Sequence, residues 1–300
     1  MTLGPATTAA LVRAGLDPAA VLDLVGRAVA EDLDGGEDVT SVATVPPELH
    51  GTAAFVPRSR GSLAGLGAAM AVLDVVVPGV VLRPLAEDGD AVTAGRPVLE
   101  ADGPVRALLT AERTALNLLC HLSGVATLTR TWVDAVEGTG ARIRDTRKTT
   151  PGLRALEKHA VRCGGGTNHR RSLSDAALVK DNHVVAAGGV AAAFSAVRTR
   201  FPGLAVEVEC DTVAQVHEVL AAGADLVLLD NMPLDELRAC VAACRERGVL
   251  TEASGGLSLD RARPVAETGV DFLSVGALTH SAPVLDIGVD LELRPRPDRE

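Results

Sequence analysis

The second half of the chain repeats short apolar runs, separated by stretches rich in Ala and Leu. The runs are 141–146, 176–181, 204–210, 225–230, 249–254 and 271–276. Helical stretches follow three of them, at 212–223, 233–248 and 259–269, and each stretch ends in Gly, a common helix terminator. Strands that alternate with helices form parallel sheets, and nearly continuous apolar runs are typical of strands buried on both faces. This half therefore predicts an α/β fold of the β/α-barrel type.

The residues that end these runs indicate where a ligand would bind. In a β/α barrel the carboxyl ends of all strands open onto one face, and ligands bind there. A single strand end that meets solvent also tolerates a charge, but polar ends repeated around a ring favour one shared pocket. In chain order the ends are Asp145 with Arg147 and Lys148, then Lys180, Glu209, Asp230, Ser254 and Gly276.

The first 120 residues have a different pattern. A helical stretch at 21–32 is followed by β-like runs at 51–56, 80–84 and 98–101, and a long helical pattern then covers 111–136. Near the end of the chain, residues 284–293 alternate apolar and polar side chains, which predicts a half-exposed strand that returns to the N-terminal sheet. We therefore expect an N-terminal α/β domain (1–120) joined by strand 284–293, a barrel domain (121–283), and an unstructured tail (294–300).

Composition narrows the class of protein. No apolar run reaches membrane-spanning length, and the N-terminus lacks the pattern of a secretion signal. The five cysteines have no disulfide or metal spacing, and we expect Cys240 and Cys244 to be two small buried thiols. The formal net charge of −10 argues against a general nucleic-acid binder. A cytoplasmic protein with neither nucleic acid nor membrane as partner is expected.

Positive charge is nevertheless concentrated in one segment, residues 142–171, which hold nine basic residues and two acidic ones. A positive zone on an acidic protein favours a pocket for a small polyanion. A solvated basic helix over 153–162 would account for Arg154, Lys158 and Arg162 without any ligand.

Lysine is rare, because 26 of the 29 basic residues are arginine. A lysine in such a chain is a candidate for work that arginine cannot do, such as placing a compact charge on a phosphate or carboxylate. The three are Lys148, Lys158 and Lys180.

The residue types at the strand ends suit a particular chemistry. Several converging cations match a ligand with more than one acidic group. The bare amides of 254–256 would suit a phosphate, although a plain tight turn explains those glycines equally well. Carboxylates at Glu209 and Asp230 make sense beside ribose hydroxyls, a Mg²⁺ shared with pyrophosphate, or a ribosyl cation. An ion pair with a neighbouring lysine is an equally good, and compatible, explanation of Glu209. Together the residues favour glycosyl transfer from a phosphorylated sugar.

At these positions the sequence closely resembles the quinolinate phosphoribosyltransferases, also called nicotinate-nucleotide pyrophosphorylases (carboxylating). The resemblance covers nearly the whole chain, and two departures stand out: His159 occupies a position where Tyr is usual, and Ser172 interrupts an expected glycine. The motifs that carry it are AERTALNLLCHLSGVAT (111–127), RDTRKTTPGLRALEKHAVRCGGGTNHR (144–170), LVKDNH (178–183), VEVEC (206–210), LLDNM (228–232), EASGGL (252–257) and VGALTHSAPVLDIGVDL (275–291).

The resemblance implies a fold and an activity. The fold is an N-terminal α/β sandwich-like domain followed by an open, incomplete TIM-like α/β barrel, as in type II phosphoribosyltransferases, in a homodimer with shared active sites. The activity is transfer of the phosphoribosyl group of phosphoribosyl pyrophosphate (PRPP) to quinolinate with Mg²⁺ and decarboxylation. The products are nicotinate mononucleotide, CO₂ and pyrophosphate, a step of de novo NAD biosynthesis.

The resemblance also implies residue roles. The quinolinate carboxylates would be held by Arg147, His169, Arg170 and Lys180, with Arg113 contributed by the partner subunit. Lys148 would contact the PRPP phosphates, while Glu209 and Asp230 would lie on the ribose and metal side, bound to Mg²⁺ directly or through water or substrate. Lys148, Lys180, Glu209 and Asp230 would be catalytic. The 5′-phosphate would lie among Ser254, Gly255, Gly256, Gly276, Ala277 and His280.

Two alternatives remain open on the sequence. A paralogue of the same fold could share these motifs and act on another heterocycle, although the full set of carboxylate-binding cations favours quinolinate. A non-catalytic PRPP-binding sensor is the other alternative. Retention of both Glu209 and Asp230 beside the cations argues against it.

Overall fold

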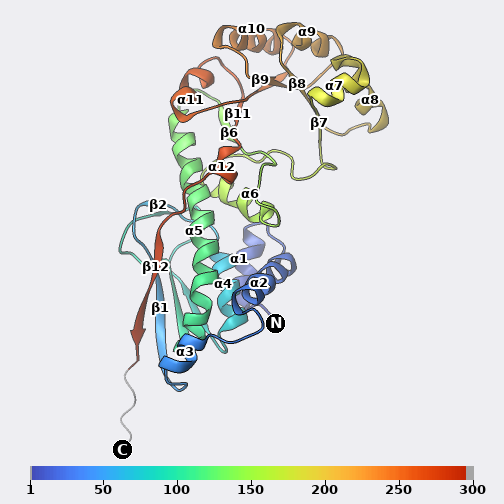
Figure 1. The fold of residues 1–300 in the computed structure, drawn as a ribbon. Helices are drawn as coiled ribbons and strands as arrows, with labels where there is room; N and C mark the ends of the chain where they lie inside the picture. The colour runs from blue at the N-terminus through green and yellow to red at the C-terminus, as the bar shows by residue number, and fades with distance from the viewer. Residues whose placement is uncertain (1, 295–300) are drawn as a thin grey trace, which may run out of the picture. The chain divides into compact units, whose positions relative to one another are not determined.

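The computed structural model describes residues 2–294, and its chain forms two compact units (Figure 1). Unit 1 contains the chain up to Leu128, Thr150–Gly165 and the chain from Ser281 onward, and unit 2 contains Thr129–Thr149 and Gly166–His280. These bounds differ from the expected domains 1–120 and 121–283 because residues 150–165 pack with the N-terminal part. Residues 295–300 of the expected tail lie outside the described residues.

Unit 1 is built on an antiparallel sheet of four strands in the order β12-β1-β5-β3. The return of the C-terminal strand is confirmed, since Ala53 of β1 pairs with Leu291 of β12. Along β5 every second residue is buried, so one face of the sheet covers a core. The sheet strands are β1 (His50–Pro57), β3 (Val81–Pro84), β5 (Leu99–Pro104) and β12 (Ile287–Leu293), and a small pair is formed by β2 (Gly61–Ser62) and β4 (Ala91–Val92).

Helices complete unit 1. The apolar stretch after Gly65 forms a helix whose first eight residues are all buried, and two N-terminal helices, α1 and α2, pack on it. The long helix predicted over 111–136 begins earlier, at Val105. The helices are α1 (Pro5–Arg13), α2 (Pro18–Leu33), α3 (Val39–Thr44), α4 (Leu66–Val76), α5 (Val105–Ala135) and α6 (Arg154–Cys163), and the part of α5 from Thr129 onward belongs to unit 2.

One expectation for this unit is wrong. Helix α6 is not a solvated basic helix, because its residues Leu156–Val161 are all buried and the side chain of Lys158 is only 1% exposed. Glu157, fully buried on the same helix, accepts hydrogen bonds from the backbone N–H of Thr150 and from the ring of His121. Charged and polar side chains can be buried when they are paired, and a count of charges along the sequence does not reveal such pairing.

Unit 2 is a parallel sheet of six strands in the order β6-β11-β10-β9-β8-β7, and each of the six predicted runs is a strand. Because β6 and β7 lie at opposite ends of this order, the barrel is open between them. The strands are β6 (Arg142–Arg144), β7 (Ala177–Val179), β8 (Val206–Cys210), β9 (Leu226–Asp230), β10 (Leu250–Ser254) and β11 (Phe272–Ser274).

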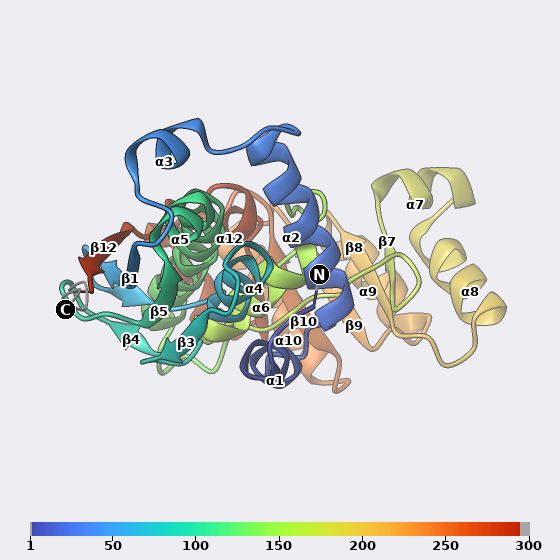
Figure 2. The same ribbon diagram turned by 90° about the horizontal axis from the view of Figure 1, so that it is seen from below.

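Helices connect these strands, and in Figure 2 the pair α7 and α8 lies together beside β7. The glycines expected to end three of the helices, Gly223, Gly248 and Gly269, all have positive φ, which residues with a Cβ rarely adopt. Cys240 and Cys244 are buried thiols, as expected. The helices are α7 (Asp181–Ala187), α8 (Val190–Arg200), α9 (Val213–Ala221), α10 (Leu234–Arg245), α11 (Leu259–Ala266) and α12 (Ala277–His280). Among residues 2–294, no helix combines the length and apolarity that a membrane span requires.

Candidate active site

The carboxyl ends of the six strands lie at one edge of the unit 2 sheet. Strand register places Ser254 opposite Asp230, Glu209 opposite Leu228, and Ser274 opposite Arg144. The sequence analysis expected polar strand ends to gather in this way, because parallel strands in register present their ends together.

A pocket of about 270 Å³ opens at this edge of unit 2. It collects six of the residues selected from the sequence: Arg147, Lys148, His169, Arg170, Lys180 and Ser254. The rest of the lining is Thr146, Leu178, Leu228, Glu252 and Ser274. A pocket with converging cations and a few apolar walls suits a small, flat, multiply charged anion.

The cations in this pocket are close enough to influence one another. Burial, together with the charge of Arg147, lowers the pKa of Arg170 from its ordinary value. The Arg170 guanidinium donates from Nη1 to the carbonyl of Ala176 at 2.9 Å, which fixes its position. Like charges held together in a partly buried site are destabilising until an anion binds between them. The pocket is therefore electrostatically prepared for an anionic ligand.

A buried aspartate positions the segment that carries His169 and Arg170. Asp145, which is fully buried, accepts hydrogen bonds from Asn168 Nδ2 and from the backbone N–H of His169, both at 2.7 Å. The preceding residue, Thr167, bonds along the free side of β6, with its N–H donating to the carbonyl of Ile143 at 2.8 Å. The glycine-rich loop thus continues the sheet beside β6 and delivers the Asn-His-Arg sequence to the pocket.

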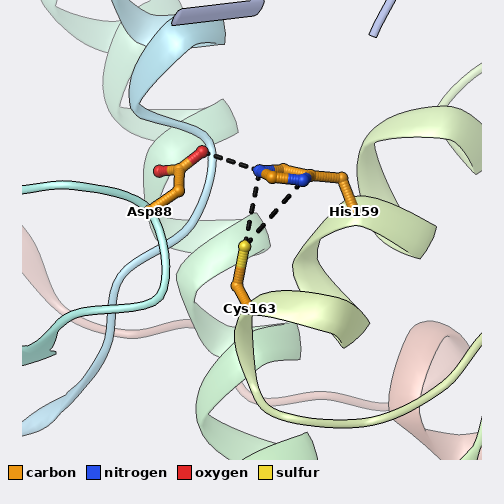
Figure 3. Close-up of side chains that lie close together, drawn as sticks. All are labelled: Asp88, His159 and Cys163. Atoms are coloured by element: carbon orange, nitrogen blue, oxygen red, sulfur yellow. Dashed lines mark hydrogen bonds and ion pairs between the residues drawn. The ribbon is translucent and has the colours of Figure 1, made fainter. Parts of the chain in front are cut away.

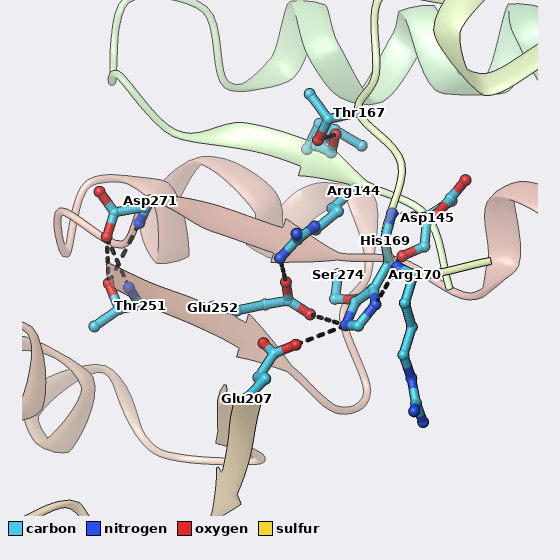
Figure 4. A network of polar contacts seen from close by, with 11 residues as sticks. Arg144, Asp145, Thr167, His169, Arg170, Glu207, Thr251, Glu252, Asp271 and Ser274 are labelled. Atoms are coloured by element: carbon cyan, nitrogen blue, oxygen red, sulfur yellow. Dashed lines mark hydrogen bonds and ion pairs between the residues drawn. The ribbon is translucent and has the colours of Figure 1, made fainter. Parts of the chain in front are cut away.

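His169 takes part in a network of polar contacts that includes Glu252, another residue of the pocket lining (Figure 4). The backbone N–H of Arg170 donates to His169 Nδ1 at 2.7 Å, so the ring proton resides on Nε2. Nε2 lies 2.7 Å from Glu207 Oε2 and 3.7 Å from Glu252 Oε1, and Glu252 Oε2 accepts from Arg144 Nη1 at 2.6 Å. Burial, reinforced by the charge of Glu207, raises the pKa of Glu252. With Nε2 close to two carboxylates, His169 orients Arg170 through the other ring nitrogen.

Lys180 and Glu209 form an ion pair, with Nζ and Oε2 2.6 Å apart, so the lysine explanation of Glu209 is confirmed. The carboxylates of Glu209, Asp211 and Asp230 also lie within 4.8 Å of one another. Asp230 Oδ2 accepts from Asn231 Nδ2 at 2.6 Å, which leaves Oδ1 for another contact. An all-oxygen set of this kind fits Mg²⁺, which prefers hard carboxylate ligands and completes its shell with water and phosphate oxygens.

The residues expected around a 5′-phosphate lie in two segments, one around Gly255 and one around Gly276. A Cβ at Gly276 would lie 2.9 Å from Lys148 Cδ and 3.2 Å from His280 Nε2, so glycine here lets both side chains approach the backbone. Gly255 has φ +90°, and a Cβ there would collide with the Asn231 side chain at 2.3 Å. A tight turn therefore requires glycine at 255, whatever else its amide binds. Ala277 opens the short helix α12 immediately after Gly276.

Comparison with known proteins agrees with this geometry. The family model for the quinolinate phosphoribosyl transferase C-terminal domain matches residues 125–290, and the model for the N-terminal domain matches residues 38–123. The chain belongs to this family. It is 52% identical over 276 residues to a nicotinate-nucleotide pyrophosphorylase (carboxylating) of Mycobacterium leprae, covering 91% of this chain and 97% of the relative.

Solved structures extend the similarity to the fold. NadC from Streptococcus pyogenes aligns with a TM-score of 0.89 at 38% identity, covering 93% of this chain and 99% of that one. The nicotinate-nucleotide pyrophosphorylase of Francisella tularensis aligns with a TM-score of 0.87 at 35% identity, covering 92% and 98%. The expected type II phosphoribosyltransferase fold, with its open barrel, is confirmed.

Several carboxylates at the candidate site were not predicted from the sequence. Glu207 and Glu252, both nearly inaccessible to solvent, and Asp211 were not selected. Glu207 and Glu252 could have been found from the sequence, because a carboxylate inside an otherwise apolar strand needs a buried partner. Glu207 and Glu209 alternate along β8 and so share a face of the strand, but only the residue at the strand end was selected.

Two further positions were singled out from the sequence. Arg113 lies on α5 in unit 1 with an exposed side chain, and its contribution from a partner subunit stays a prediction. Ser172, where the resemblance predicts a glycine, supports its loop through hydrogen bonds. Its Oγ accepts from the N–H groups of Ser174 and Asp175 at 3.1 and 3.2 Å, and its own N–H donates to Asp175.

Proposed function

We propose that this chain is the phosphoribosyltransferase that converts quinolinate and PRPP to nicotinate mononucleotide, pyrophosphate and CO₂ in de novo NAD biosynthesis. The observation that carries the proposal is the gathering of Arg147, Arg170, Lys148 and Lys180 at one pocket of a barrel in this family. Its five cysteines are free thiols, which fits a reducing compartment such as the cytoplasm.

The pocket favours a dicarboxylate over a monocarboxylate. Arginine forks bind carboxylates bidentately, and two of them, with Lys180 nearby, provide more positive charge than a single carboxylate neutralises. An anion with one carboxylate would leave part of the repulsion between Arg147 and Arg170 uncompensated. Quinolinate, with carboxylates on adjacent ring carbons, matches this charge, whereas nicotinate does not.

The remaining residues suit the sugar phosphate. Lys148, whose side chain lies beside Gly276, would bind phosphate oxygens there together with His280, and Ser254 ends strand β10 in the same pocket. Glu209 and Asp230, joined by Asp211, would hold Mg²⁺ and face the ribose. When bound, Mg²⁺ would neutralise charge on the departing pyrophosphate. Carboxylates near the ribose would also stabilise the positive charge that develops on its anomeric carbon.

The reaction then requires little acid–base chemistry from the chain. The pyridine nitrogen forms a bond to the anomeric carbon as the bond to pyrophosphate breaks. The N-ribosylated ring is an electron sink, so the bond to the 2-carboxylate breaks with its electron pair retained by the ring, and a proton then adds at that carbon. The cations hold the ring in place during these steps and compensate its remaining carboxylate.

A homodimer with shared sites is part of the proposal, with Arg113 of one subunit serving the pocket of the other. Mixing Arg113→Ala with Lys148→Ala protein tests this directly. Hybrid dimers would contain one intact site, so about a quarter of the wild-type activity should return after random subunit exchange. No recovery above the two separate variants, under conditions where subunits exchange, would place Arg113 outside the shared site.

The deciding experiment incubates the purified protein with quinolinate, PRPP and Mg²⁺ and follows pyrophosphate and nicotinate mononucleotide, with nicotinate as a parallel substrate. Product from quinolinate alone, lost in Arg147→Ala, is the expected result. Turnover of nicotinate instead would favour a paralogue for another heterocycle. Binding of PRPP without turnover would favour a non-catalytic sensor.

A further inference from the structure

A second cluster of reactive side chains lies in unit 1 and contains none of the residues proposed for catalysis. His159 Nε2 lies 2.8 Å from Asp88 Oδ2, and Cys163 Sγ lies 3.4 Å from the same nitrogen (Figure 3). The three ligand-type atoms all lie within 4.8 Å of one another. Among the described residues this cluster alone combines carboxylate, imidazole and thiol groups in the range of a metal ion.

Local structure holds the three side chains in place. His159 and Cys163 are four residues apart on α6, which puts them on the same face of the helix. Asp88 lies in the turn between β3 and β4, and its Oδ1 accepts from the backbone N–H of Leu66 at 2.9 Å, so Oδ2 is directed at the histidine. The cluster is therefore assembled by one helix and by a turn whose aspartate is anchored through a backbone hydrogen bond.

The cluster opens onto a large pocket in unit 1, of about 640 Å³. Asp88 and His159 line it together with Asp90, Glu87 and Arg13. The side chain of His159 is 8% exposed and that of Asp88 17%, so a group bound between them would be shielded by protein yet accessible from the pocket.

A role for Cys163 as a catalytic nucleophile is disfavoured. Burial, reinforced by the Asp88 charge, raises the pKa of Cys163 to about 12, so the thiol is protonated at neutral pH. Cys163 Sγ also lies 3.4 and 3.9 Å from both nitrogens of the His159 ring, an arrangement unlike a directed hydrogen bond to one of them. A cation that displaces the thiol proton would make use of all three groups.

We propose that Asp88, His159 and Cys163 form a binding site for a divalent metal ion of the zinc class, with its fourth coordination position open to the unit 1 pocket. Sulfur, nitrogen and oxygen donors together select Zn²⁺ and exclude Mg²⁺, which takes oxygen ligands. Ligands of a tetrahedral zinc lie about 3.3–3.8 Å apart, given bond lengths of about 2.0–2.3 Å. The observed 3.4 Å between Cys163 and His159 already lies in that range, and the 2.8 Å between His159 and Asp88 would have to widen by about 0.5 Å.

Neighbouring charges set the expected strength of the site. Arg162 Nη2 lies 3.4 Å from His159 Nδ1 and opposes a cation, but it is also bonded to the carbonyl of Ala14 at 2.7 Å. Asp90 and Glu87 add negative charge on the pocket side. Because the site is open to the pocket and the charge of Arg162 partly opposes a cation, metal binding should be reversible. It should also be weaker than at a closed four-ligand structural zinc site.

His159→Tyr is the most informative variant for testing the metal site, because the resemblance predicts Tyr at this position. Purified protein is titrated with Co²⁺ in excess Mg²⁺, which occupies oxygen-only sites, and the thiolate-to-cobalt absorption is followed. The wild type should bind one equivalent with this absorption, and Zn²⁺ should displace it. In His159→Tyr and Cys163→Ser the affinity for Co²⁺ should fall by at least about a hundredfold, since loss of a group that only hydrogen-bonds to a metal ligand already costs about 10–100-fold.

Matched controls separate site loss from misfolding. Cys120→Ser removes a half-buried thiol outside the cluster and should leave the cobalt titration unchanged. Turnover of quinolinate by each variant without Co²⁺ reports that the protein is folded. Equal Co²⁺ affinity in the wild type and His159→Tyr, or thiolate absorption that survives Cys163→Ser, would overturn the proposal.

Discussion

The two buried polar clusters of this molecule are built on opposite principles. In unit 2, Arg144, His169, Glu207 and Glu252 come from three strands and a loop, and the two glutamates are almost fully enclosed. In unit 1, Asp88, His159 and Cys163 come from one helix and one turn, and the cluster borders a pocket. The first encloses charged groups that depend on one another because solvent does not reach them, while the second holds groups that border a pocket. Removing one side chain of the cluster should therefore lower the free energy of unfolding strongly in unit 2 and only slightly in unit 1.

The largest effect is expected for Arg144→Ala. It leaves Glu252, which has no solvent exposure, without its cationic partner, and breaking a buried pair costs about 3–5 kcal/mol of the free energy of unfolding. Proton uptake by Glu252 would recover part of this loss. Urea unfolding can be followed by the fluorescence of Trp132, the single tryptophan, which is buried in unit 2.

Arg142→Ala is the matched control for that variant. Both guanidiniums stack on the ring of Phe272, at 4.6 and 4.4 Å, but the ion pair with Glu252 is made by Arg144. Arg142→Ala should cost about 1 kcal/mol or less, the worth of an exposed cation–π contact. Equal losses in the two variants would mean that stacking, and not the buried charge pair, stabilises this strand.

Next in size is the loss of catalysis in Lys148→Ala. Its side chain lies against Gly276 at the pocket, and removing one preorganised charge from a transition state costs about 10²–10³ in rate. The kcat/KM for PRPP should fall by that factor with little change in stability. Arg171→Ala, an exposed basic residue of the same segment, should stay within about twofold because surface charges act weakly at a distance. A comparable loss there would mean that the whole basic segment, rather than the pocket, attracts the substrate.

A pH dependence of stability should follow from Glu252. Its pKa is raised in the folded protein from the ordinary 4.5, so the folded state binds the proton more tightly than the unfolded state. Stability is then fully present below about pH 4.5 and is lost as the pH rises towards the raised pKa, with a slope of at most about 1.4 kcal/mol per pH unit. Glu252→Gln should remove this slope. A wild type that gains stability over the same interval through this residue would contradict the raised pKa.

The contrast between the clusters also explains what could be predicted from the sequence. Strand ends such as Lys180 and Asp230 were found because parallel strands bring their ends together whatever the register of individual side chains. Glu252 was missed because its role depends on which strand neighbours it and where Arg144 points. Asp88 and His159 are 71 positions apart, and their contact depends on how a turn meets a helix. The periodicity of apolar residues along the sequence does not predict that contact.

The smallest effect, and the sharpest test of the comparison, is expected for Asp88→Asn. The asparagine oxygen can still accept from the N–H of Leu66, so only the interaction with His159 changes, at a cost of about 0.5–1.5 kcal/mol. Urea unfolding monitored by far-UV circular dichroism should show this small loss without added metal. With Zn²⁺ present the gap should widen, because only the wild type gains stability from binding. A loss as large as that of Arg144→Ala without metal would mean that Asp88 compensates a fixed buried charge. The two clusters would then follow the same principle.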